Sequence, residues 1–145
     1  MAILKVLTHP DEFLNKISKP VIEFDQSLHQ LLDDMNDTMG KNCIGIAAPQ
    51  VGILKRACII LTRDGALELI NPEITAGSRL KSGEEACISI PKFQTRVKRY
   101  HTLTISAQNR HGHFFQMELY GIDAVCAQHE IDHLNGVLLT CHAKK

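Results

Sequence analysis

The sequence has no excess of charge of either sign and no long apolar stretch. Sixteen basic side chains balance sixteen acidic ones, so the chain lacks the cationic surface typical of proteins that bind nucleic acid or anionic membranes. None of its segments approaches the roughly 20 apolar residues that a membrane-spanning helix needs, and its first residues do not resemble a secretory signal. We therefore expect a soluble, unexported protein that binds neither nucleic acid nor membrane directly.

The sequence also lacks the cysteine pattern of a secreted, disulfide-linked domain. It has five cysteines, an odd number, at wide and irregular spacing, which is typical of free thiols in a reducing compartment. No internal repeat, low-complexity tract or linker divides the chain. Its 145 residues, of which 44% are apolar and 22% charged, have the usual size and composition of one globular domain. We expect a single domain over residues 1–145.

Two helices are predicted near the N-terminus. The first is a short surface helix over residues 11–18, with Asp11 as its N-cap and an end imposed by Pro20. The second begins at about Asp25, ends near Gly40 and is amphipathic. Its apolar residues recur at three- and four-residue intervals, namely Leu28, Leu31, Leu32, Met35 and Met39.

The middle of the chain has the patterns of antiparallel strands. Residues 57–61 and 67–70 are apolar and flank a polar turn, which predicts a hairpin. Residues 103–107 and 115–119 alternate apolar and polar side chains, which predicts a second hairpin with one buried face. Cys87 is expected at the start of a further strand. The expected class is α+β, with antiparallel β-sheets surrounding a C-terminal metal-binding helix and helices at the N-terminus.

The third helix, expected from Gly121 to about Asn135, carries the pentapeptide HEIDH at residues 129–133. Histidines four residues apart project from the same side of a helix and can bind one metal ion, while Glu130 between them can act as general base. So short a motif can arise by chance on a solvated helix. However, both histidines share a face with apolar residues such as Val125, where two unpartnered imidazoles would be costly to bury. Metal binding explains that placement.

A catalytic metal site needs a third protein ligand and an open position for water. Only twelve residues follow His133, and His142, the sole later histidine, lies in a polar tail. Upstream, Cys87 could complete a Cys–His–His set, although a free cysteine is more often a small buried apolar residue. Residues 45–52 are a second candidate segment, because small residues let a ligand approach the backbone while Gln50 presents its amide. A tight connection between helix and strand is the alternative.

Three segments, in this order, resemble the signature motifs of peptide deformylases. They are GIAAPQVG at residues 45–52, EEACIS at residues 84–89, and QHEIDH at residues 128–133. The resemblance covers nearly the whole chain, from about Leu7 to Leu139. It implies a metal-dependent hydrolase that removes the N-formyl group from the N-terminal formylmethionine of nascent polypeptides and releases formate.

The resemblance implies a role for each residue of the site. Three side chains would bind one divalent metal ion, namely Cys87, His129 and His133. Bacterial enzymes of this family use Fe(II), with zinc, nickel or cobalt as substitutes. Glu130 would be the general base and then the general acid. The side-chain amide of Gln50 and the backbone N–H of Ile88 would stabilise the negative charge that develops on the formyl oxygen.

The resemblance also indicates how the substrate would be bound. Gly45 would offer backbone hydrogen bonds to the peptide, and Ile44 and Val125 would line an apolar pocket that selects methionine by shape. Formyl-Met nascent peptides are the expected partners, with a transient ribosome contact. The protein is expected to be a cytoplasmic monomer, encoded by a bacterium or by a phage in a bacterial host rather than by an organelle.

Two supporting interactions are predicted behind the metal ligands. Asp132, on the opposite side of the helix from the two histidines, would pair with Arg99, and Glu85 would hydrogen-bond a ligand histidine or brace the cysteine segment. The alternative for Asp132 is an ordinary solvated acid on a helix surface.

Four departures from the family pattern bear on the cleft and on docking. Cys43 stands where glycine is common, and Ala86 replaces a glycine of the cysteine segment, so the cleft would be narrower or reshaped. Gln94 occupies a position near the cleft rim where arginine is common. Only six residues follow Leu139, so we expect a short form without the further C-terminal helix of many bacterial members and with altered ribosome docking.

Two other functions are compatible with parts of the pattern. A zinc peptidase that cuts internal peptide bonds would share the pentapeptide, but its third ligand should lie downstream. A noncatalytic metal-binding or peptide-binding protein would not need Glu130 and Gln50 together with three ligands. Formate release from a formyl-Met peptide separates both from a deformylase.

Overall fold

The computed structural model describes residues 2–40 and 44–143, so the predicted effect of Cys43 lies outside the described residues. Within them, five strands form one antiparallel sheet in the order β1-β2-β3-β4-β5. The strands are β1 (Gly45–Ala47), β2 (Ala57–Thr62), β3 (Gly65–Cys87), β4 (Ile90–Gln108) and β5 (Phe114–Tyr120). The helices are α1 (Gln26–Met39), α2 (Ile122–Leu134) and α3 (Leu139–Ala143), with 3-10 helices η1 (Glu12–Asn15) and η2 (Ala48–Val51). The predicted α+β class is confirmed, with a single sheet rather than several.

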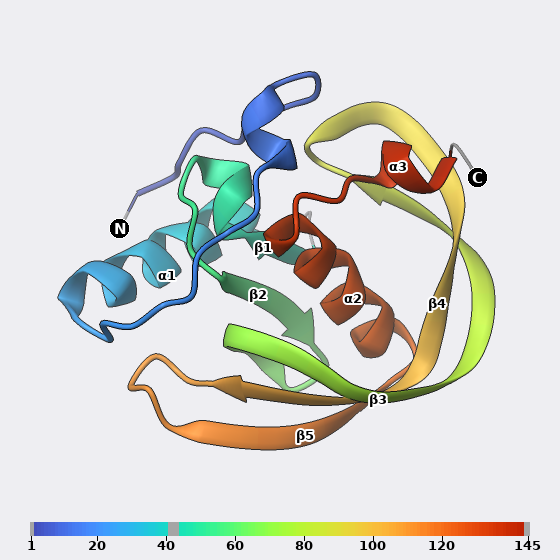
Figure 1. Ribbon diagram of the computed structural model, residues 1–145. Coiled ribbons are helices and arrows are strands. Elements are labelled where there is room, and N and C mark those ends of the chain that lie inside the picture. The colour runs from blue at the N-terminus through green and yellow to red at the C-terminus, as the bar shows by residue number, and fades with distance from the viewer. Residues whose placement is uncertain (1, 41–43, 144–145) are drawn as a thin grey trace.

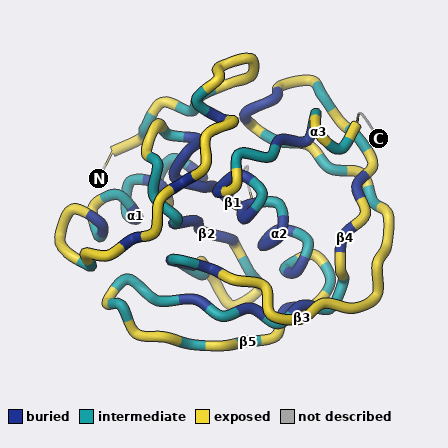
Figure 2. Tube along the Cα trace, viewed as in Figure 1, coloured by how far each residue is buried: buried dark blue, intermediate teal, exposed yellow. Residues whose placement is uncertain are grey.

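Strand β2 is buried on both of its faces. Ala57 and Ile59 pack in a cluster with α1, whereas Cys58 and Ile60 pack in a second cluster with α2. Because successive side chains of a strand point to opposite faces, helices on both sides of β2 explain its continuous apolar run. Figure 1 shows α2 at the centre of the molecule, with the sheet curving around it, and Figure 2 shows the buried residues gathered along this helix.

Both predicted hairpins are present. In the second, the apolar residues face one another directly across β4 and β5, in the pairs Leu103–Leu119, Ile105–Met117 and Ala107–Phe115. Strands β3 and β4 are much longer than the patterns indicated, at 23 and 19 residues. Between residues 75 and 86, β3 is largely exposed, so it lacks the apolar alternation by which a half-buried strand is recognised. Together, β3 and β4 form a two-stranded ribbon that curves around α2 (Figure 1).

The N-terminal helices differ in how well the sequence predicted them. Helix α1 begins after Asp25, whose side chain accepts from the N–H of Leu28, and ends at Gly40, as expected. The helix predicted over residues 11–18 was wrong in extent, because only the four residues of η1 are helical. Beyond η1 the chain extends, and the N–H of Ser18 bonds to the carbonyl of Leu134 at the end of α2.

One prediction near the site was also wrong, because Cys87 is the last residue of β3 and not the first of a strand. Ahead of the polar tail, Leu138 and Leu139 are buried in a cluster with Leu14, Ile90 and Val97. The five-residue helix α3, which begins at Leu139, was not predicted. None of the helices in the two described ranges is both long and apolar enough to cross a membrane.

Candidate metal centre and adjoining pocket

Three candidate ligands meet where the end of β3 faces the C-terminal half of α2. Cys87, His129 and His133 each place a donor atom within 4.8 Å of the others. The Sγ atom of Cys87 lies 3.3 Å from Nε2 of His133, and the two imidazole rings are 5.2 Å apart. The structure therefore brings together the thiol and the two imidazoles that the sequence suggested.

The chemistry of this donor set fits a divalent metal ion. A thiolate with two neutral imidazoles is a ligand set that leaves a fourth position open. Burial, together with the positive charges of His129 and Arg99, lowers the pKa of His133 to about 3, which keeps this imidazole in the neutral form that binds metals. For His129, burial alone would lower the pKa, but contacts with Cys87 and Glu85 raise it to about 10. A metal ion would compete with that proton.

An ion-paired network fixes the orientation of His129. Its Nδ1 lies 3.0 Å from Oε1 of Glu85, which leaves Nε2 as the nitrogen available to a metal. Arg99 donates two hydrogen bonds of 3.0 Å to Glu85 and one of 2.7 Å to Asp132. Burial alone would raise the pKa of Glu85, but the hydrogen bonds from His129 and Arg99 outweigh it and lower the pKa to about 2. Both predicted contacts, Arg99–Asp132 and Glu85–His129, are present.

Glu130 is a buried carboxyl group beside the donor set, only 4% exposed. Its Oε1 has no hydrogen-bond partner among the described residues, and burial raises its pKa to about 7 against the opposing charges of His129 and Arg99. A carboxyl group with such a pKa can accept and return a proton near neutral pH. Gly45 makes room for it, because a Cβ atom on residue 45 would lie 2.6 Å from Oε2 of Glu130.

Gln50, on η2, is held with its amide nitrogen toward Cys87. Its Oε1 accepts a hydrogen bond of 2.9 Å from the N–H of Ala47, which fixes which way the amide points. Its Nε2 lies 3.1 Å from Oγ of Ser89 and 3.7 Å from Sγ of Cys87. Ile88 lies between β3 and β4 and lines the same pocket. Ser89 is an additional site residue that its sequence context did not reveal.

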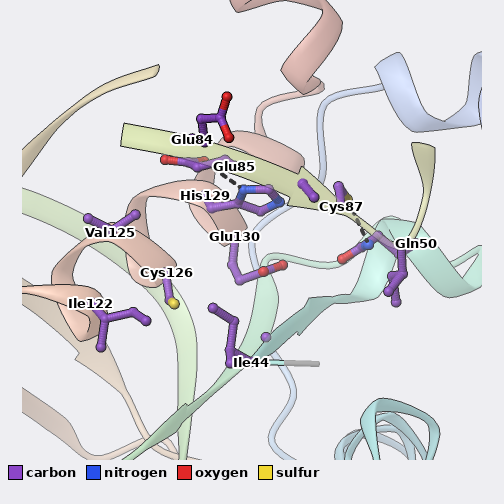
Figure 3. Close-up of a pocket in the computed structure, with 13 residues that line it drawn as sticks. Ile44, Gln50, Glu84, Glu85, Cys87, Ile122, Val125, Cys126, His129 and Glu130 are labelled. Carbon is purple, nitrogen blue, oxygen red and sulfur yellow. Dashed lines mark hydrogen bonds and ion pairs between the residues drawn. The ribbon is translucent and has the colours of Figure 1, made fainter. Parts of the chain in front are cut away.

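A pocket of about 540 Å³ opens beside the donor set. Its lining includes the three residues predicted to contact substrate, Ile44, Gly45 and Val125. Ile122 and Cys126 line it as well, and Cys126 is part of the pocket wall although it is only 4% exposed. Figure 3 shows the Glu130 carboxylate pointing toward the same space as the His129 ring and the Gln50 amide. A mainly apolar cavity thus adjoins the polar groups.

Ala86 and Gln94, two of the residues that depart from the family pattern, lie at different places relative to the pocket. Ala86 belongs to the pocket lining, next to Cys87, and its predicted effect on the shape of the cleft stays a prediction. Gln94 pairs with Ala86 across the β3–β4 ladder, and it is exposed and outside the pocket lining. Its position next to a lining residue is compatible with the predicted place near the cleft rim.

Gln128, the first residue of the QHEIDH motif, is a further supporting residue, whose role the motif did not indicate. Its buried side chain accepts a hydrogen bond of 3.0 Å from the N–H of Tyr100 and donates one of 2.7 Å to the carbonyl of Tyr100. The amide thereby pairs with β4 as a neighbouring peptide group would. This contact anchors α2 to the sheet one residue before His129.

Comparisons with known proteins agree with this geometry. The family model described as polypeptide deformylase matches residues 3–145. A peptide deformylase of Caldicellulosiruptor bescii is 49% identical over 139 residues, covering 95% of this chain and 84% of the relative. Peptide deformylase 1 of Bacillus subtilis is 45% identical over 148 residues, covering 100% and 92%. The crystal structure of a Thermotoga maritima peptide deformylase superimposes with a TM-score of 0.93 at 35% identity, covering 97% of each chain.

Proposed function

This chain belongs to the peptide deformylase family, whose members are metal-dependent hydrolases that remove the N-formyl group from nascent peptides, and we propose that the residues around Cys87 and Glu130 carry out this reaction. The observation that supports these roles is the juxtaposition of a buried, unpartnered carboxyl oxygen of Glu130 with a Cys–His–His donor set in one pocket. Released formate and a free N-terminal amine are the products.

Three side chains would hold the metal ion, namely Cys87, His129 and His133. When bound there, a divalent ion supplies a Lewis acid that polarises the formyl carbonyl and makes water a nucleophile at neutral pH. Fe(II) is proposed as the native metal because the family resemblance implies it. Zinc, nickel or cobalt are proposed as substitutes, because thiolate and imidazole donors can also bind these metals.

Glu130 would move the proton in both halves of the reaction. Its carboxylate takes a proton from the attacking water, and the resulting carboxylic acid delivers it to the departing amine nitrogen. A pKa of about 7, raised by burial, suits both steps because the two protonation states are similar in free energy near neutral pH.

Gln50 and Ile88 would stabilise the negative charge that develops on the formyl oxygen. The amide of Gln50 is oriented by Ala47 so that its N–H groups face the site, and preorganised donors of this kind need no rearrangement during the reaction. The backbone N–H of Ile88 would be the second donor, from the turn directly after Cys87.

The peptide would be held by strand β1 and by the apolar pocket. β1 is an edge strand, since in the described sheet it pairs with β2 alone, so the other edge at Gly45 can pair with an extended peptide. The methionine side chain would enter the pocket between Ile44 and Val125. A peptide deformylase of Acinetobacter baumannii, 34% identical with a TM-score of 0.90, has been crystallised with Met-Ala-Ser bound.

The cellular setting follows from this substrate. Formyl-Met peptides emerge from the ribosome, so we propose a cytoplasmic monomer of bacterial or phage origin that contacts the ribosome transiently.

Formyl-Met-Ala-Ser separates deformylation from the two other candidate functions. Protein loaded anaerobically with Fe(II) is expected to convert it to formate and intact Met-Ala-Ser, measured by formate assay and mass spectrometry, whereas metal-free protein is expected to release none. Fragments cut inside the tripeptide would favour an internal peptidase. No product with Fe(II) bound would indicate a peptide-binding protein without activity.

Gly45→Ala is expected to reduce kcat by about 10- to 100-fold, because the added methyl group would displace the Glu130 carboxylate and small misplacements of a reacting group are costly. Formate release and metal content are the measurements. Gly83→Ala is the matched control, since a Cβ atom on that residue of β3 meets nothing within 4 Å. Equal kcat values for the two variants would contradict the contact between Gly45 and Glu130.

A further inference from the structure

His142, on α3, is tied to the catalytic helix. Its Nε2 lies 3.0 Å from Oδ2 of Asp132, and both side chains are about three-quarters buried, with exposed fractions of 22% and 25%. The contact lies where α3 packs beside β4, near the C-terminus (Figure 1). The residue that the sequence placed in a polar tail is therefore part of a defined interaction.

Asp132 continues this contact toward the candidate metal centre. The same Oδ2 atom accepts the 2.7 Å hydrogen bond from Arg99; Arg99 binds both oxygens of Glu85; and Glu85 holds Nδ1 of His129. The inner part of the path is more deeply buried than its start, since the side chains of Arg99 and Glu85 are only 6% and 9% exposed. Four consecutive hydrogen-bonded contacts thus connect α3 with a candidate ligand.

The C-terminal segment reaches the donor set by a second route. Leu138 and Leu139 belong to a buried cluster with Ile90 and Val97, and the side chain of Cys87 packs against this cluster. The segment from Leu138 to His142 therefore supports the candidate thiolate through apolar packing and a candidate imidazole through hydrogen bonds.

We propose that His142 is a positioning residue for the metal centre, acting through Asp132, Arg99 and Glu85 on the ring of His129. Without the imidazole, Asp132 would lose one of the two groups that fix its carboxylate, and water would take that place. Because hydrogen bonds in a network strengthen one another, Arg99 and Glu85 would then hold His129 less firmly. The inference rests on the proposed function, since it requires His129 to bind the metal.

The test uses full-length protein loaded with Co(II), whose visible spectrum reports on ligand geometry. His142→Ala is expected to speed loss of Co(II) to EDTA by about 3- to 10-fold, less than the roughly 10- to 100-fold effect on metal affinity of removing a direct partner of a ligand, and to alter the spectrum. His142→Gln can still donate a hydrogen bond to Asp132 and is expected to restore both. His113→Ala, which removes an exposed histidine outside the network, is the control.

A double-mutant cycle with Glu85→Gln distinguishes relayed positioning from a local effect on α3. If His142 acts through Glu85, its removal changes the Co(II) release rate less in the Glu85→Gln background than in the wild type. Additive effects, or equal release rates and spectra for wild type and His142→Ala, would overturn the role of His142. Failure of the wild type to bind one Co(II) per chain would overturn the metal site itself.

Discussion

Glu130→Gln is expected to lower kcat for formate release by about 100- to 10,000-fold, the usual effect of losing a general acid–base group. Glutamine has nearly the same shape, so it fits the space that Gly45 leaves, but it cannot take a proton from water. The measurement is kcat of Fe(II)-loaded wild type and variant at equal metal content. KM is expected to change little, because the carboxyl group acts mainly on the transition state.

Glu84→Gln is the matched control for this prediction. Glu84 also belongs to the pocket lining, but it is exposed and its carboxylate points away from His129 and Glu130 (Figure 3). It is expected to retain wild-type kcat within about twofold. If Glu130→Gln were as active as Glu84→Gln with metal bound, another group would have to move the proton.

Cys87→Ala is expected to weaken metal binding by more than about 100-fold, because losing a ligand should exceed the 10- to 100-fold effect of losing a group behind one. The two imidazoles left by this variant come from a single helix and cannot enclose the ion from the side of β3. Metal content after gel filtration, measured by elemental analysis, is expected to fall well below one ion per chain, and formate release should fall in proportion.

Cys126→Ala separates the ligand role of Cys87 from the general loss of a cysteine near the pocket. Burial, with added negative charge from Glu130 and Asp123, raises the pKa of Cys126 to about 12, so this sulfur remains a thiol. The variant is expected to keep one metal ion per chain. Full metal occupancy in Cys87→Ala would show that the thiolate is not a ligand.

The local patterns of the sequence predicted some elements closely and others poorly. Helix α1 and the β4–β5 register could be predicted because each has one buried face, so apolar residues recur with the period of the element. The distal part of the β3–β4 ribbon could not be predicted. Its stretch around Lys81 is exposed and mostly polar on both faces, so apolar residues do not recur there with the period of a strand. α3 was missed because it is only five residues long and has a single buried residue, Leu139, so it shows no apolar period.

The candidate site was predictable where one helix or one motif sets the geometry. The pentapeptide implied that His129 and His133 face the same way. Cys87 could be assigned as a ligand only from the order of the motifs, because no local pattern determines which strand approaches a helix. The roles of Ser89, Gln128 and His142 could not be predicted for the same reason. Each acts through a partner that is distant in sequence, and a single polar residue produces no repeating pattern by which its role could be recognised.

The curvature of the β3–β4 ribbon also bears on the order of folding. Cys87 and His133 are 46 positions apart, and we expect them to meet only after the ribbon has closed around α2. Contacts of this kind form late, because the entropy of closing a long loop must be offset before they contribute. Capture of a metal ion is therefore expected to follow formation of the sheet, and an ion bound at this point would link the two ends of that loop and slow its reopening.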